Sequence, residues 1–100
     1  MNINEYLNKN IKIVDPVKFA EIANAGKAIP ENVLKEMENL KVVRVFTGGT
    51  AAHYNQETLN PFIVCVPEMY KDTTKYDAKS DTYDNEWTLY ANELPCFQVI

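Results

Sequence analysis

Apolar positions in the first forty residues recur at helical spacing. A helix is predicted from Asp15-Pro16, a capping residue followed by proline at the first helical position, to Gly26. A second helix is predicted from Pro30, because apolar residues then repeat at intervals of three and four. The two apolar faces comprise Val17, Phe19, Ala20, Ile22 and Ala23, and then Val33, Leu34, Met37 and Leu40. A helical turn over 2–8 and a short strand over 11–14 precede them.

After Lys41 the pattern changes to short β-branched and aromatic runs, which are typical of strands. These runs cover 41–46, 51–54, 62–66, 87–90 and 96–100. The run 62–66 is apolar throughout, which predicts a central strand buried on both faces. We expect its residues Phe62, Val64 and Val66 to pack against the helices. Helices followed by an antiparallel meander predict an α+β fold, with N-terminal helices packed on an antiparallel sheet of about four to five strands.

One hundred residues suit a single domain. We expect a helical part over about 1–40, a β meander over about 41–100 and, inside the meander, an acidic loop over about 67–86. This loop is long for a connection in a compact domain, which predicts a hairpin arm or a functional loop. Its tyrosines combine apolar area with a polar tip, as is common in recognition loops.

The net charge of −4 is unevenly distributed along the chain. Residues 1–50 contain seven bases and six acids, whereas residues 51–100 contain three bases and eight acids. Because the chain lacks the excess of Lys and Arg that displaces counterions, we do not expect direct nucleic-acid binding. No apolar run approaches the roughly 20 residues of a membrane span, and 1–10 lack a signal-peptide pattern. We therefore expect a cytoplasmic protein that does not bind membranes.

No residue pattern predicts catalysis. Cys65 and His53 form the one thiol–imidazole pair available, but the apolar run around Cys65 disfavours a reactive thiolate. Cys65 and Cys96 are instead predicted to be buried free thiols in a reducing compartment. We therefore expect no enzyme activity.

Metal and phosphate sites are also not expected. Two distant cysteines and one histidine do not make a zinc site. The spacing over 77–88 resembles a calcium loop, but Lys79, Thr82 and Thr88 replace the residues needed at its third, sixth and twelfth positions. The glycine pair within 47–50 predicts a hairpin turn, because the remaining phosphate-loop residues are missing. We expect no cofactor.

With these chemistries disfavoured, the acidic second half favours a binding function. Carboxylates on a rigid scaffold can imitate the phosphates of DNA and occupy the basic surface of a protein partner, such as a nucleic-acid enzyme. The predicted partner-binding residues are the acids and aromatics in and beside the loop: Asp72, Tyr76, Asp77, Asp81, Tyr83, Asp84, Glu86 and Trp87. The alternative is that the acidic loop only keeps the protein in solution.

Three segments carry a family resemblance. They are Ile29-Pro30-Glu31-Asn32-Val33, His53-Tyr54-Asn55-Gln56-Glu57-Thr58 leading into 62–66, and Trp87-Thr88-Leu89. In this order they resemble the small phage-encoded inhibitors of uracil-DNA glycosylase. The resemblance implies N-terminal helices followed by an antiparallel sheet in an acidic chain of similar size. The predicted helix over 15–25 and the loop over 67–86 depart from the family pattern, as does the lack of an acidic segment before the second helix.

Together these features predict a non-catalytic inhibitor from a phage or mobile element. It would belong to the anti-CRISPR, anti-defence or DNA-mimic class and bind a host defence or nucleic-acid enzyme in the host cytoplasm. An immunity protein against a toxin and a phage structural or assembly subunit remain as alternatives.

Overall fold

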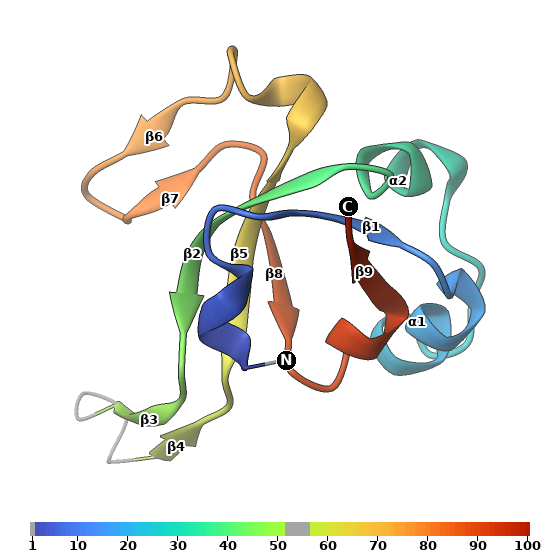
Figure 1. Ribbon diagram of the computed structural model, residues 1–100, viewed down its shortest axis with the longest axis horizontal. Coiled ribbons are helices and arrows are strands. Elements are labelled where there is room, and N and C mark those ends of the chain that lie inside the picture. Colours follow the sequence, from blue (N-terminus) through green and yellow to red (C-terminus); the bar gives the residue numbers. More distant parts are fainter. Residues whose placement is uncertain (1, 52–56) are drawn as a thin grey trace.

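The computed structural model describes residues 2–51 and 57–100 (Figure 1). Five strands form an antiparallel sheet with the order β8-β5-β2-β1-β9. Their bounds are Asn10–Ile13 for β1, Leu40–Phe46 for β2, Phe62–Pro67 for β5, Trp87–Tyr90 for β8 and Phe97–Val99 for β9. The predicted α+β class with a sheet of about five strands is confirmed.

The helices begin close to where the sequence predicts. Helix α1 (Pro16–Ala23) is capped by Asp15, whose carboxylate accepts a hydrogen bond from the backbone N–H of Lys18 at 3.0 Å. It ends through Gly26, which has a φ of 81° and donates its N–H to the carbonyl of Ala20. This left-handed conformation favours glycine.

Within residues 2–51 and 57–100, α1 is accompanied by a second, short α-helix and three 3-10 helices. Helix α2 (Glu31–Glu36) is shorter than predicted, because the apolar repeat runs on into β2, whose first residue is Leu40. The 3-10 helices are η1 (Ile3–Tyr6), η3 (Glu68–Tyr70) and η4 (Leu94–Cys96). No helix in the described ranges is long and apolar enough to cross a membrane.

The sheet is not a plain meander. Strand β9 does not pair with β8 but returns to the opposite edge and pairs with β1, so that Ile11 lies opposite both Leu40 and Val99. Helices α1 and α2 lie in the connection from β1 to β2. The first and last strands of the sheet are therefore neighbours, which ties the two ends of the chain together.

Two small hairpins extend from this sheet. Strands β3 (Gly49–Ala51) and β4 (Glu57–Leu59) pair antiparallel, so β3 begins inside the segment predicted as a turn and β4 lies between the predicted strands 51–54 and 62–66. Most of the predicted strand over 51–54 lies outside the described residues. The second hairpin consists of β6 (Tyr76–Asp77) and β7 (Thr82–Tyr83). We call residues 71–86 the arm, which Figure 1 shows on the side of the sheet away from α1.

The core lies between the helices and one face of the sheet. Strand β5 contributes Ile63 and Cys65 to it, both fully buried, together with Phe19 of α1 and Met37 after α2. The prediction that Phe62, Val64 and Val66 face the helices is therefore wrong. Because side chains alternate along a strand, these three lie on the opposite face, and burial of Val64 and Val66 there hides the alternation in the sequence.

Candidate functional site

The arm is a hydrogen-bonded hairpin rather than an irregular loop. Tyr76 and Tyr83 lie opposite each other on β6 and β7, with ring centroids 5.1 Å apart. In the turn between the strands, the carboxylate of Asp77 accepts the backbone N–H of Lys79 at 2.9 Å. Asp81 has a φ of 54°, a left-handed conformation that aspartate tolerates better than most residues. Cross-strand aromatic pairs of this kind stabilise a short hairpin.

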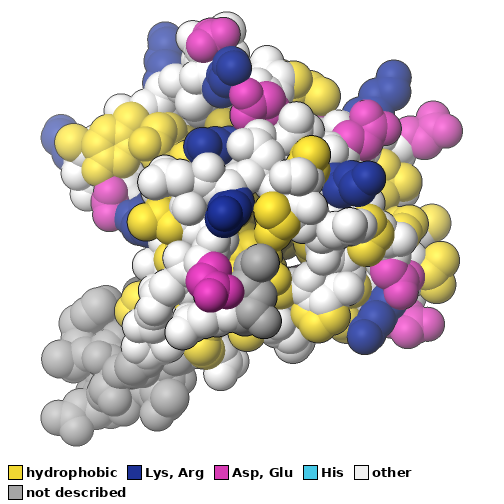
Figure 2. Space-filling view, viewed as in Figure 1, with side chains coloured by type: hydrophobic (Ala, Val, Ile, Leu, Met, Phe, Trp, Pro, Cys, Tyr) yellow, Lys and Arg dark blue, Asp and Glu magenta, His cyan; other side chains and the backbone are white. Residues whose placement is uncertain are grey.

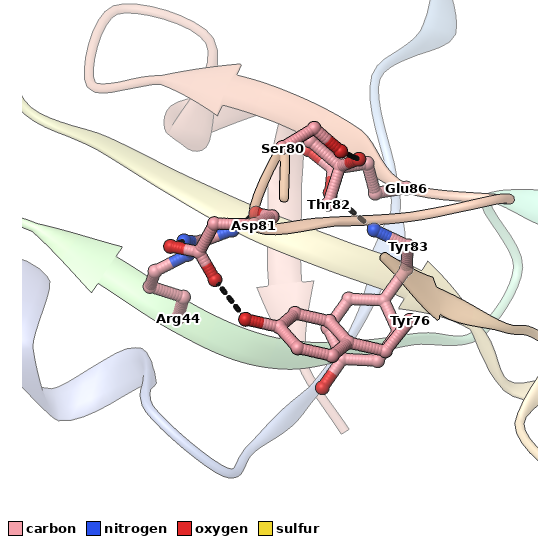
Figure 3. A network of polar contacts seen from close by, with 7 residues as sticks. All are labelled: Arg44, Tyr76, Ser80, Asp81, Thr82, Tyr83 and Glu86. Atoms are coloured by element: carbon pink, nitrogen blue, oxygen red, sulfur yellow. Dashed lines mark hydrogen bonds and ion pairs between the residues drawn. The ribbon is translucent and has the colours of Figure 1, made fainter. Parts of the chain in front are cut away.

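The turn of the hairpin is fastened to the sheet by three residues that we call the clasp: Arg44, Tyr76 and Asp81 (Figure 3). The guanidinium of Arg44, on β2, donates to the carboxylate of Asp81 and, at 2.6 Å, to its backbone carbonyl. The hydroxyl of Tyr76 donates to the other carboxylate oxygen of Asp81. Two elements far apart in sequence are thus joined by charge-assisted hydrogen bonds.

The clasp changes the titration of two of its members. The hydrogen bond from Tyr76, followed by the charge and hydrogen bond of Arg44, lowers the pKa of Asp81. The same hydrogen bond to Asp81 raises the pKa of Tyr76. Both shifts favour an ionised carboxylate and a protonated phenol, which are the forms that the observed contacts require.

Hydrogen bonds also hold the end of the arm nearest β8. The backbone N–H of Asp84 donates to the carbonyl of Lys75 at 3.0 Å. The carboxylate of Glu86 accepts the backbone N–H of Tyr83 at 2.8 Å, as Figure 3 shows. Hydrogen bonds within the arm therefore continue to the start of β8.

The other end of the arm is fixed through Glu68. Its carboxylate accepts a hydrogen bond from Asn10 at 2.9 Å and pairs with Lys71 at 2.9 Å. The hydrogen bond from Lys71 is the main cause of the lowered pKa of Glu68. The arm is thus tied to the body by Lys71 at its first end and, through the clasp, at its turn.

Most of the predicted partner-binding residues come together on this arm. Asp72, Asp77 and Asp84 are exposed, and Tyr76 is 52 % exposed. Asp81 is also exposed, but its charge is paired with Arg44. Lysines are interspersed with acidic residues along this segment of the sequence, and Figure 2 shows both kinds of side chain mixed in this region. The arm is therefore a mixed-charge, tyrosine-bearing surface and not an unbroken row of carboxylates.

Trp87 is placed apart from the arm tyrosines. It packs against the core from the helix side and lines a cavity of about 220 Å³ with Phe19, Val33 and Met37. Because β8 alternates, Thr88 and Tyr90 face the other way, toward the outer surface of the sheet. The indole of Trp87 therefore belongs to a different face from Tyr76.

A second surface, which was not predicted from the sequence and which we call the outer groove, lies beside the arm. Its volume is about 390 Å³, and residues from β2, β5 and β8 line it. The rings of Phe46 and Phe62 stack with centroids 5.0 Å apart, and Tyr90 meets Phe62 edge-on at 5.8 Å. The lining comprises Arg44, Phe46, Phe62, Val64, Glu86 and Tyr90, among others. The sequence signal for this groove was that Phe46 and Tyr90 each directly follow an inward-facing residue, Val45 and Leu89 respectively.

Among the described residues, the two thiols are buried and the calcium-like segment 77–88 does not form a metal-binding loop. Cys65 and Cys96 are free and buried, as predicted. Burial raises the pKa of the Cys65 thiol to about 12, and burial also raises the pKa of Cys96. His53 lies outside the described residues. Within the described residues, no group of three or more His, Cys, Asp or Glu side chains is arranged to hold a metal ion, and 77–88 span parts of β6 and β8 with β7 between them.

Comparisons with protein-family models, curated proteins and solved structures find no match for this chain. The resemblance to inhibitors of uracil-DNA glycosylase therefore stays a prediction.

Proposed function

We propose that this chain is a non-catalytic protein that binds and blocks the basic surface of a larger protein. In the form that we favour, it is a phage or mobile-element inhibitor of a host defence or nucleic-acid enzyme and acts in the cytoplasm. The observation that carries this proposal is the arm, a projecting hairpin whose turn is fastened to β2 by the clasp.

A fastened hairpin suits binding because little conformational freedom remains to be lost when a partner docks. Tyr76 and Tyr83 are in contact and their orientation is set by the β6–β7 pairing. Tyrosine is among the residues that contribute most to protein–protein affinity, since it offers a large rigid surface with a polar tip. The exposed ring of Tyr76 is therefore the expected contact at the arm.

Charge supports the choice of a basic partner. The chain carries −4 overall, and the second half, which contains the arm, has eight acids against three bases. Unlike charges accelerate association and disfavour acidic competitors. Asp72 and Asp84 form no ion pair with other described residues, so their charges face solvent. Because Arg44 balances Asp81, these exposed acids matter more than Asp81 for attraction at a distance.

The test is capture of a partner from a bacterial lysate with immobilised protein. The arm variant is Asp72→Lys with Asp84→Lys, and the matched control is Glu21→Lys with Glu38→Lys, which changes the net charge equally at exposed sites outside the arm. We expect the wild type and the control to capture the same specific protein, and the arm variant to lose it. Circular dichroism checks that both variants fold.

Equal capture by the arm variant and the wild type would refute binding through the arm. The identity of the captured protein decides between the alternatives. A defence or nucleic-acid enzyme supports the inhibitor proposal, and a toxin supports an immunity protein instead.

A further inference from the structure

The outer groove exposes aromatic surface on the face of the sheet opposite the core. Phe46 and Phe62 are half-buried, while Tyr90 is 45 % exposed. Their stacked and edge-on arrangement makes one continuous aromatic surface across three strands. Val64, which is 2 % exposed, closes the floor beside these rings. Clustered apolar surface of this kind, bordered by polar groups, is typical of a binding site.

Charged groups at the same groove determine what can occupy it. Arg44 lines the groove, but two of its nitrogens donate to Asp81 (Figure 3). Glu86 uses one carboxylate oxygen to accept the N–H of Tyr83, and the other oxygen has no hydrogen-bond donor among the described residues. Two carboxylates thus stand beside one guanidinium. The net charge of −1 disfavours an anionic occupant and favours a cationic one.

We propose that the outer groove binds an arginine side chain of the protein partner, stacked on the aromatic surface with its charge toward Glu86. This inference rests on the proposed function and names the chemistry of the contact. A cation over an aromatic ring is attracted by the electrons of the ring face. Arginine fits better than lysine, because its planar guanidinium stacks on a ring and still donates hydrogen bonds to a carboxylate in the same plane.

The groove and the arm form one surface. Arg44 belongs to both the clasp and the groove lining, and Glu86 ends the arm and lines the groove. A basic partner that contacts Tyr76 is therefore positioned to place an arginine on the neighbouring rings. The clasp keeps Arg44 from competing with that arginine for the groove, since Asp81 already satisfies its charge.

The test uses three capped tripeptides, Gly-Arg-Gly, Gly-Leu-Gly and Gly-Gln-Gly, titrated into the ¹⁵N-labelled full chain. We expect the arginine peptide to shift the amide signals of β2, β5 and β8 around Phe46, Phe62 and Tyr90, and the other peptides to shift them far less. Glu86→Gln should weaken arginine-peptide binding about tenfold, because it removes a charged acceptor. The amide oxygen of the substituted side chain is still able to accept the N–H of Tyr83, so the arm is retained. Glu21→Gln is the control and should bind as the wild type does.

Three results would overturn the inference. They are equal binding of the leucine peptide, unchanged binding by Glu86→Gln, and shifts centred on the arm carboxylates instead of the groove. The two proposals fail separately. If the arginine peptide binds in the groove but the arm variant captures the partner normally, the proposed function fails. If the arm variant loses the partner but no peptide enters the groove, this inference fails.

Discussion

Arg44 on β2 and Asp81 in the turn of the arm lie 37 residues apart in the sequence and are joined by two hydrogen bonds, one to the carboxylate and one to the backbone carbonyl. The backbone contact means that Arg44 fixes the path of the chain and not only one side chain. Both residues are partly exposed, so this contact is expected to govern local opening of the arm more than global stability.

Arg44→Ala should therefore release the arm while the body stays folded. We expect faster amide hydrogen exchange at Tyr76, Tyr83 and Asp84, with unchanged protection in β5. Lys12→Ala, an exposed substitution on β1, is the control and should leave both regions as they are. Unchanged exchange in the arm of Arg44→Ala would show that the hairpin holds its position without the clasp.

The clasp should also open at low pH. The pKa of Asp81 is lowered in the folded protein, so the contribution of the clasp is complete above the ordinary aspartate pKa of about 4. It is lost as the pH falls through the lowered folded value. We expect the arm amide signals to shift below about pH 4, with a midpoint below the ordinary aspartate pKa. Asp81→Asn should abolish this transition, and a transition that persists in Asp81→Asn would assign it to another carboxylate.

The sequence predicted the elements of the fold better than their arrangement. Asp15-Pro16 and Gly26 marked the ends of α1 through local rules of capping and positive φ, which need no tertiary information. The pairing of β9 with β1 could not be predicted in this way, because it joins segments more than 80 residues apart in sequence.

The candidate site was predicted in part. The tyrosines and acids of the arm stood out because a long polar segment in a small domain is unusual. The outer groove did not stand out in the sequence. Val64 and Val66 are as buried as Ile63 and Cys65, so β5 has no polar face that would show which side of the strand points outward. The clasp was missed because Arg44 carries no local signal of its long-range partner.

The observed orientation of β5, with Ile63 and Cys65 toward the core, leads to a prediction about stability. Ile63 is fully buried among the core residues, so Ile63→Ala should lower the free energy of unfolding by about 2–5 kcal/mol. Val17→Ala, at a position that is 70 % exposed, should change it by less than about 0.5 kcal/mol. Urea denaturation followed by circular dichroism measures both. Similar small losses for the two variants would place Ile63 outside the core.

The thiols should be unreactive in the folded protein. The pKa of Cys65 is raised to about 12 by burial, so the thiolate is scarce under ordinary assay conditions, and Cys96 is fully buried. We expect no reaction with Ellman's reagent under native conditions and two equivalents of thiol after unfolding, since the chain has two cysteines. Ser80→Cys, exposed in the arm, is the positive control and should react at once. Rapid labelling of Cys65 in the native protein would show instead that this thiol is accessible and reactive.

Glu93 should prevent the edge of the sheet at β8 from pairing with a second molecule. It lies just after the edge strand β8, is 8 % exposed, and its carboxylate accepts the backbone N–H of Tyr90 at 2.8 Å. The backbone N–H of Glu93 in turn donates to the carbonyl of Tyr90 at 2.8 Å. Both backbone groups of Tyr90 are thus occupied, and a neighbouring molecule cannot pair with them.

Glu93→Ala should free the N–H of Tyr90 and promote self-association through β8, seen as a concentration-dependent rise in mass by light scattering. It should also lower the free energy of unfolding by about 1.5–3 kcal/mol, because a part-buried hydrogen bond to a charged acceptor is lost. Glu93→Gln retains an acceptor oxygen at the same place and should remain closer to the wild type in both measurements. If Glu93→Gln associates as strongly as Glu93→Ala, the negative charge itself, and not the hydrogen bond to Tyr90, keeps the edge unpaired.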